Sequence, residues 1–390
     1  MLKEKDIKFI SKQFSMKSKS LLSVSNVYMG FLKGDTGEIL SSEIKSWNYY
    51  EEDVQALLMK TFKKVYSGKP DIKIFCPKFL DETIDTIDSM YDFVTDIDSS
   101  SRDSFKEKCD SIVSHIGENH IYNENMVFIA MNGSIHKDGV ARNIFVGTLC
   151  KVKQGDTNFI YKMSKKEDDD DNDEDSDFTH CFKFTSSIDC IINLSSPVDG
   201  ITYPILTDGT ALRDMIGYYS SKSNKPDTVL ISNVFGCDVK LTAQQENIFF
   251  TKILNTITDS KMSANDLYNV YNHLRNNVSD GDTSEEDIVI ESIEISKAME
   301  GCDINKIIEV KDAFKQVFGF ENYTFKMVNV LPPVEKKSIS ISNDDADIRL
   351  KPDSLQNLKQ VQDENGQVFL MIPMSENATT NGFELPIEQL

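Results

Sequence analysis

The chain has 390 residues, of which 39% are hydrophobic and 27% charged, and its formal net charge is −21. This length exceeds what one hydrophobic core usually serves, and the apolar content excludes a wholly disordered chain, so at least two folded parts are expected. The negative net charge opposes non-specific binding to nucleic acid or anionic membranes. The apolar runs are shorter than the ~20 residues that a membrane-spanning helix needs. We therefore expect a cytoplasmic protein with no membrane partner.

Residues 1–165 are expected to form an N-terminal α/β part. Ile7, Ile10 and Phe14 recur at helical spacing and predict a helix over 3–16. The elements predicted after it are strands around a turn at 33–37, a helix near 54–65, acidic helices near 81–94 and 104–116, a central strand at 126–135, and strands at 144–152 and 159–163.

The first predicted helix is locally basic although the chain is acidic. Its lysines outnumber Glu4 and Asp6, the two acidic residues of this stretch. Such a helix either contacts a nucleic-acid backbone or another acidic partner, or it is an ordinary solvated helix face. The lysines concerned are Lys3, Lys5, Lys8, Lys12, Lys17 and Lys19.

Residues 166–177 are expected to form an acidic loop between two strands. Every residue from Glu167 to Asp175 is acidic except Asn172. Like charges at this density repel one another and favour an extended, solvated segment. No register places Gly at position 6 and Glu at position 12 of an EF-hand loop, so a specific calcium site is not predicted.

The rest of the chain is divided into residues 178–322, a sheet continuation followed by helices, and residues 323–390, a small β unit. Thr242 with Gln245, and Ser263 with Asp266, predict capped helix starts. The remaining predicted elements are strands at 178–194 and 228–234, helices within 241–318, and strands at 323–330, 338–341, 347–350, 358–361 and 368–372. The predicted fold class is therefore α+β, with a mixed or antiparallel central sheet, helices, a helical middle segment and a small C-terminal β unit.

The best candidate binding segment runs from Tyr203 to Tyr219. It combines a loop that follows a strand with a predicted short helix, and loops after strands are where ligands commonly bind. In the alternative interpretation, an aspartate caps the helix and the tyrosines pack on the sheet with their hydroxyls at its rim. The candidate residues are Tyr203, Asp208, Arg213, Asp214, Tyr218 and Tyr219.

Several familiar chemistries lack their sequence signatures. The glycines near Lys33 do not have the spacing of a phosphate-binding loop. His115 and His120 are five residues apart, which puts them on different faces of a helix. No nucleophile elbow is seen. The seven cysteines are odd in number and widely spaced, as expected of reduced, buried thiols. We therefore predict no cofactor, no metal and no catalytic residue, although an enzyme of unrecognised type stays an alternative.

The order of several short motifs resembles an uncharacterised cytoplasmic protein family of low-GC Gram-positive bacteria that is described only as a domain of unknown function. The motifs are Gly200-Ile201-Thr202-Tyr203-Pro204, Thr207-Asp208, Tyr218-Tyr219-Ser220, Gly236-Cys237-Asp238, Ile348-Arg349-Leu350-Lys351-Pro352-Asp353 and Asn381-Gly382. The resemblance covers most of the chain and implies no activity. More distantly, the C-terminal half is similar to bacterial nucleoid-associated proteins, which have helices followed by a small β unit.

One departure from the family pattern bears on the candidate site. The family places an arginine after the aspartate that corresponds to Asp208, and an aspartate and a histidine before the paired tyrosines. Gly209, Leu212 and Asp214 stand at those positions here, so a site built from that triplet would be altered. The function expected is a non-catalytic interaction or scaffold protein with a protein partner or as a homo-oligomer, and a nucleic-acid-associated protein is the alternative.

Overall fold

The computed structural model divides the chain into two compact units, residues 1–240 and 241–390. Strands on both sides of the acidic segment lie in unit 1, while residues 166–177 themselves lie outside the described residues. The finer four-part division expected from the sequence stays a prediction. The residues that the structure describes are 2–16, 20–81, 90–164, 181–207, 210–259, 262–278, 288–299, 304–332, 339–342, 347–350, 358–374, 379–380 and 383–384.

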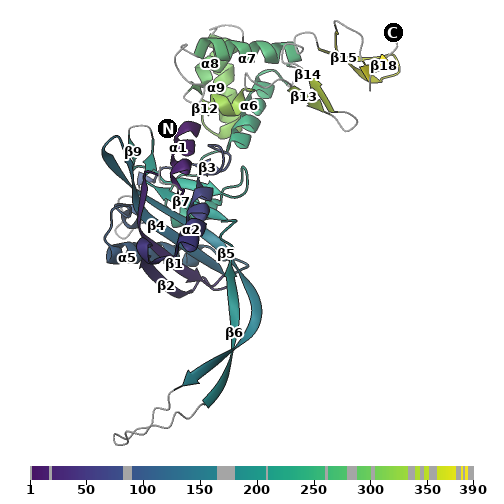
Figure 1. The fold of residues 1–390 in the computed structure, drawn as a ribbon. Helices are drawn as coiled ribbons and strands as arrows, with labels where there is room; N and C mark the ends of the chain where they lie inside the picture. The colour runs from purple at the N-terminus through teal and green to yellow at the C-terminus, as the bar shows by residue number, and fades with distance from the viewer. Residues whose placement is uncertain are drawn as a thin grey trace, which may run out of the picture. The chain divides into compact units, whose positions relative to one another are not determined.

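Unit 1 is built on an eight-stranded sheet with the order β2-β1-β4-β5-β7-β10-β3, in which β6 pairs with β5 (Figure 1). All of these strand pairings are antiparallel, which confirms the predicted α+β class and decides between a mixed and an antiparallel sheet. The strands are β1 (Leu22–Leu32), β2 (Ile39–Ser46), β3 (Ile74–Phe75), β4 (Met126–Lys137), β5 (Val140–Ser164), β6 (Cys181–Ile192), β7 (Asp199–Tyr203) and β10 (Gly217–Ser220), with a separate hairpin of β8 (Ile205–Leu206) and β9 (Ala211–Leu212).

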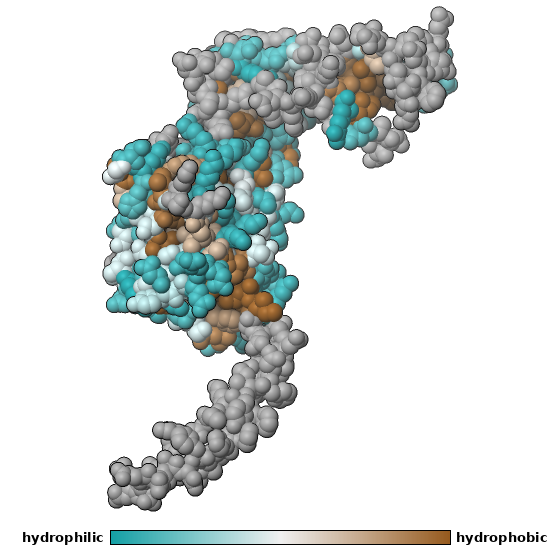
Figure 2. Space-filling model, viewed as in Figure 1, coloured by the Kyte–Doolittle hydropathy of each residue, from teal (hydrophilic) through white to brown (hydrophobic). Residues whose placement is uncertain are grey.

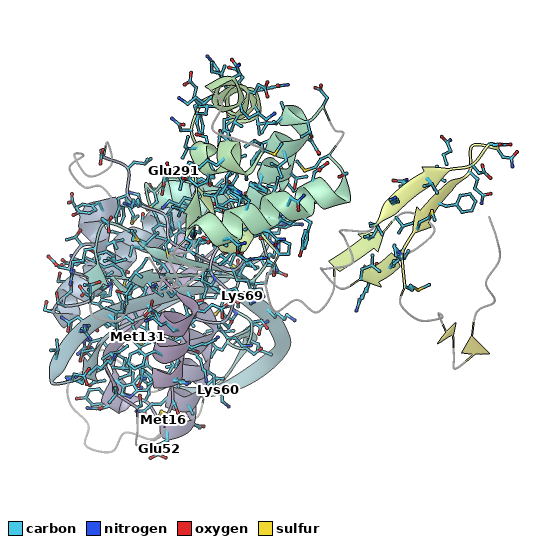
Figure 3. The ribbon with its side chains drawn as sticks, turned by 90° about the horizontal axis from the view of Figure 1, so that it is seen from above. Met16, Glu52, Lys60, Lys69, Met131 and Glu291 are labelled. Atoms are coloured by element: carbon cyan, nitrogen blue, oxygen red, sulfur yellow. The ribbon has the colours of Figure 1, made fainter. Side chains whose placement is uncertain are left out.

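Helices cover both faces of this sheet because neighbouring strand residues point to opposite sides. Tyr28 packs in a core with the helical elements α4 (Met90–Val94), α5 (Arg102–Asn119) and η2 (Leu230–Val234). Its neighbour Val27 packs in a second core with α1 (Glu4–Gln13) and α2 (Glu52–Val65). Met131 of β4 belongs to this second core, whereas Glu52 and Lys60 of α2 are exposed (Figure 3).

The predicted strand at 228–234 is wrong, because residues 228–229 are helical and Leu230–Val234 form the helical turn η2. Asp227 Oδ1 accepts hydrogen bonds from the backbone N–H groups of Val229 and Leu230, as a helix cap does. Leu230, Ile231 and Val234 are buried together, which is a helical spacing rather than an alternating one. Long apolar runs of this kind do not distinguish a strand from a short buried helix.

Unit 2 contains the predicted helices and a set of two-stranded hairpins. Its capped helix starts are confirmed, since Thr242 and Gln245 bond each other's backbone N–H groups, as do Ser263 and Asp266. The elements are α6 (Ala243–Ile257), α7 (Ala264–Val278), β11 (Val289–Ile290), α8 (Ser292–Ala298), α9 (Ile304–Phe318), β12 (Phe325–Lys326), α10 (Met327–Val330), β13 (Ile339–Ser342), β14 (Asp347–Leu350), β15 (Lys359–Gln362), β16 (Val368–Met371), β17 (Thr379–Thr380) and β18 (Phe383–Glu384).

The strand predicted at 323–330 is only partly right, because β12 is short and leads directly into α10. The buried carboxylate of Glu246 accepts the backbone N–H of Lys326 and the side-chain amide of Asn329, both at 3.1 Å. Met327 and Val330, three residues apart, both face the core of unit 2. A helical turn satisfies this spacing, and a strand would not.

Candidate functional site

The predicted binding segment spans the end of β7, the β8–β9 hairpin and β10. Tyr203 and Tyr218 are buried in the core that α5 covers, and Tyr219 is buried in the core on the opposite face of the sheet. The predicted short helix is wrong, because Tyr218 and Tyr219 pair with both β7 and β3. The three aromatic rings are therefore part of the folded core.

Arg213 connects this segment to the residues that precede α5. Its guanidinium donates to Asp98 Oδ2 at 2.9 Å, lies 3.5 Å from Asp96 Oδ1, and sits 5.7 Å from the centre of the Tyr203 ring. The Asp98 side chain has 0% exposure, and within the described part of the chain its Oδ1 has no hydrogen-bond partner. Arg213 therefore compensates the charge of Asp98 by direct contact, and the charge of Lys108 also acts on Asp98.

Among the described members of the predicted set, Arg213 and Asp214 are the exposed ones. The Arg213 side chain is 46% exposed and the Asp214 side chain 58%. Asp214 Oδ2 lies 3.4 Å from Lys78 Nζ, which is a surface ion pair. Asp208 lies outside the described residues. A role of Arg213 and Asp214 in binding stays a prediction.

A second polar cluster lies at the start of β7. Asp199 is buried, and its Oδ1 accepts a 2.6 Å hydrogen bond from the Tyr218 hydroxyl. Burial raises the pKa of Asp199 to about 6, against the opposing effect of that hydrogen bond. Burial and the neighbouring Asp199 carboxylate raise the pKa of Tyr218 well above its usual value, so that its hydroxyl remains a donor at neutral pH.

His120 and Asp227 form a hydrogen-bonded pair whose charges act on Asp199. His120 Nε2 lies 2.7 Å from Asp227 Oδ2, and the imidazole stacks on the Tyr122 ring with centres 4.2 Å apart. His120 Nδ1 is buried and finds no hydrogen-bond partner among the residues that the structure describes. The other Asp227 oxygen caps η2, so this pair ties α5 to η2 and leaves no imidazole nitrogen free at the surface.

The predicted basic helix is α1, which presents lysines on its exposed side. Lys8 Nζ pairs with Glu4 Oε2 at 2.9 Å, so part of this basic charge is already neutralised. Contact with nucleic acid stays a prediction. Of the six lysines, Lys5, Lys8 and Lys12 are exposed and Lys3 is partly buried. Lys17 and Lys19 lie outside the described residues.

The described residues offer few groups for other chemistry. Within that part of the chain, no three His, Cys, Asp or Glu side chains are arranged to hold a metal ion. No helix there combines the length and apolarity needed to cross a membrane. Burial raises the pKa of the Cys109, Cys150 and Cys237 thiols, to about 12 for Cys150, which keeps them in the weakly nucleophilic protonated form.

The far ends of β5 and β6 pair with each other beyond the other strands of the sheet (Figure 1). The pairing of β5 with β7 ends at Leu149 and its pairing with β4 ends at Lys151, whereas its pairing with β6 extends to Ser164. We call the paired residues 157–164 and 181–188 the ribbon. Within the described residues, the ribbon strands have no pairing partner other than each other.

Successive residue pairs of an antiparallel ribbon belong to alternate faces, so the register assigns each residue to a face. We call the two faces the apolar face and the lysine face. The apolar face takes the pairs Met163–Phe182, Tyr161–Phe184, Phe159–Ser186 and Thr157–Ile188. The lysine face takes Ser164–Cys181, Lys162–Lys183, Ile160–Thr185 and Asn158–Ser187.

Comparison with known families gives one match. The profile of a family described as Domain of unknown function (DUF4317) matches residues 1–383. The chain belongs to this family. The resemblance to a domain-of-unknown-function family is thereby confirmed over nearly the whole length, and no curated protein matches the chain.

The DUF4317 description carries no activity, so the roles of residues must be argued from geometry. In this DUF4317 chain, sequence reasoning missed Asp98, Asp199 and Asp227, and it considered His120 only as a metal ligand. Only Asp227 had a local signal, because it follows Pro226 and precedes an apolar run, as a helix cap does. The other three contact residues far away in sequence, and no pattern within one element indicates such contacts.

Proposed function

We propose that this chain is a non-catalytic protein that binds another polypeptide through the apolar face of the ribbon. The observation that carries the proposal is the register of β5 and β6, which assigns Phe159, Tyr161, Met163, Phe182 and Phe184 to a single face. A strand-pair face that gathers large apolar residues is typical of a surface that another element or another chain covers. The opposite face carries lysines, which suit solvent.

The energetics favour a covered ribbon. An isolated two-stranded ribbon is marginally stable in water, and packing its apolar face against another element adds hydrophobic stabilisation. The face holds four aromatic residues, each able to bury about 150–250 Å².

The apolar face is continuous with a core of unit 1, which supports the same reading. Ile192 lies an even number of residues from Phe182 and Phe184 along β6, so it belongs to the same face of that strand. Ile192 and its partner Val152 both pack in the core that α2 covers. The Thr61 hydroxyl of α2 donates to the Leu194 carbonyl at 3.0 Å, tying this helix to the residues after β6. Figure 2 shows apolar surface on unit 1 over the region where Figure 1 has β5. A partner on the ribbon would extend the layer that α2 begins.

The two alternatives find less support in the described residues. For catalysis, the three described buried thiols are protonated and the His120 imidazole is held by Asp227. For nucleic-acid binding, the exposed lysines of α1 are set against a chain charge of −21, and Lys8 already has a carboxylate partner. DNA retention that falls with salt and is lost on removing the α1 lysines would favour that alternative.

The proposal predicts that partner recovery depends on one face of the ribbon. The full chain, the variant Phe182→Ser/Phe184→Ser and the variant Ile160→Ser are each used as bait for proteins from cells that naturally produce the chain. The double variant should lose the polypeptides that the wild type recovers, because serine cannot replace the aromatic contact area. Ile160→Ser, which changes an apolar residue on the lysine face, should retain them. Equal recovery by all three baits would contradict the proposal.

A further inference from the structure

We infer that the open edge of β2 pairs with the same edge of a second copy of this chain, which joins the sheets of two copies into one. β2 ends the strand order of the eight-stranded sheet, and within the described residues it pairs only with β1 (Figure 1). A sheet edge presents backbone N–H and C=O groups that can pair with another strand. This surface is separate from the ribbon, so the inference goes beyond the proposed function and does not depend on it.

The pairing of β1 with β2 determines which backbone groups of β2 point away from β1. In the turn between the two strands, the Lys33 N–H donates to the Glu38 carbonyl at 2.9 Å. Hydrogen-bonded positions alternate along a strand, so the next hydrogen-bonded pair is Phe31 with Ser41. Every second residue of β2 after Ser41 also faces β1, and the residues between them face outward. The outward residues are Ser42, Ile44 and Ser46.

Little within the described residues competes for these outward groups. In that part of the chain, one side chain reaches them: Arg102 Nη2 donates to the Ile44 carbonyl at 3.1 Å. A carbonyl oxygen has two lone pairs, so Ile44 can accept a strand hydrogen bond beside the arginine. β2 is also regular where the outward residues lie, because the register shift of its pairing with β1 lies before Ser41.

The charges of β2 favour one register of self-pairing. When Ile44 lies opposite Ile44 of the second copy, Glu43 lies opposite Lys45 of that copy, and the two-fold symmetry repeats this pair. Centring the pairing on Glu43 or on Lys45 would instead place like charges directly opposite, which destabilises a sheet. Both side chains are exposed and lie near Tyr50, with Lys45 Nζ 4.6 Å from the centre of its ring. The register centred on Ile44 therefore forms cross-strand ion pairs on one face.

The same register also matches the backbone groups of the two strands. Ser42 lies opposite Ser46 of the second copy, so each outward residue meets an outward residue and can exchange hydrogen bonds with it. Centring on Ser42 would place Ile44 opposite Leu40, which the register shift leaves out of the pairing with β1. β2 contains one glutamate and one lysine, so the paired strands carry no net charge. A second copy of β2 thus fits this edge in both hydrogen bonding and charge.

Sedimentation equilibrium of the purified full chain at physiological salt tests the inference. The wild type should be a concentration-dependent dimer. Glu43→Lys and Lys45→Glu should each raise the dissociation constant by about tenfold or more, because the cross-strand ion pairs become like-charged. An equimolar mixture of the two variants should dimerise like the wild type, since lysines of one copy then face glutamates of the other. Lys60→Glu, on the exposed side of α2, is the control matched in charge to Lys45→Glu and should leave the dimer unchanged.

The mixture separates pairing from folding defects, because it uses the same two variant chains that fail alone. A wild type that stays monomeric up to several hundred micromolar, or a mixture that dimerises no better than either variant, would overturn the inference. An equally strong effect of Lys60→Glu would do the same. If Phe182→Ser/Phe184→Ser abolishes the dimer and the charge reversals do not, the ribbon joins the copies, so this inference is wrong while the proposed function stands.

Discussion

Arg213 and Asp214 are neighbours in sequence, but their side chains form different ion pairs in the fold. Arg213 compensates the fully buried carboxylate of Asp98, whereas Asp214 makes a surface ion pair with Lys78. Arg213→Ala should lower the free energy of unfolding by about 1–3 kcal/mol, because it leaves a buried acceptor without its partner. Asp214→Ala should change it by less than ~1 kcal/mol.

Chemical denaturation measures both values. Adding Asp98→Asn to Arg213→Ala is the control, since removing the orphaned charge should recover part of the lost stability. Equal, small losses for Arg213→Ala and Asp214→Ala would show that the Asp98 pair contributes nothing. In that case Arg213 would be free to serve in binding, as the sequence predicted.

Asp199 makes a pH prediction whose sign follows from its pKa. The pKa rises from 3.8 to about 6 on folding, so between those values the folded chain keeps a proton that the unfolded chain releases. The contribution of Asp199 to stability should therefore fall as pH rises from about 4 to about 6 and then stay level. Asp199→Asn cannot ionise, so it should lack this fall and be more stable near pH 7 by up to about 3 kcal/mol.

Urea denaturation at several pH values compares Asp199→Asn with the wild type, and Glu52→Gln on the exposed start of α2 is the control. The neighbouring groups that act on Asp199 are present in all three proteins, so the difference between the curves isolates Asp199; these groups are Tyr218, His120, Asp227 and Lys222. Parallel curves for Asp199→Asn and the wild type would show that Asp199 ionises normally.

At the scale of elements, the sequence predicted what short-range patterns determine. The amphipathic helices α1 and α2, the hairpin of β1 and β2, and the capped start of α6 all follow from spacing or capping within one segment. The four-residue strand β10 was mistaken for a helix because its identity depends on pairing with β3 and β7, far away in the chain. Such pairings have no signal in the residues of β10 alone.

The candidate site was predictable only in part, for the same reason. The sequence drew attention to the polar and aromatic residues around Tyr203, but most of their partners come from other elements. The sequence predicted a strand at 159–163. The faces of the ribbon could not be assigned until the register fixed which residue of β6 lies opposite each residue of β5.

The ribbon should be dispensable for the folding of unit 1. The pairs that join β5 to β4 and β7 end at Lys151, before the ribbon begins. Replacing residues 155–189 by Asn-Gly would join Gln154 to its partner Cys190 through a tight turn. We expect the melting temperature to change by only a few degrees, since loop length has a small effect on stability. A loss of cooperative unfolding would show that the ribbon supports the core.

At the scale of the molecule, an acidic chain carries a strand pair, the ribbon, whose register assigns large apolar residues to one face. The net charge of −21 keeps most of the surface unfavourable for contact between copies. Membership of the DUF4317 family adds no activity to this account, so the ribbon is its central claim.

Site-specific photo-crosslinking in the cell tests that claim most directly. One full-length variant carries the photoreactive side chain at Tyr161, on the apolar face, and a matched variant carries it at the adjacent Lys162, on the lysine face. We expect irradiation to join the Tyr161 variant to another polypeptide and to leave the Lys162 variant largely unjoined. Equal adducts from both positions, or none from Tyr161, would contradict the account.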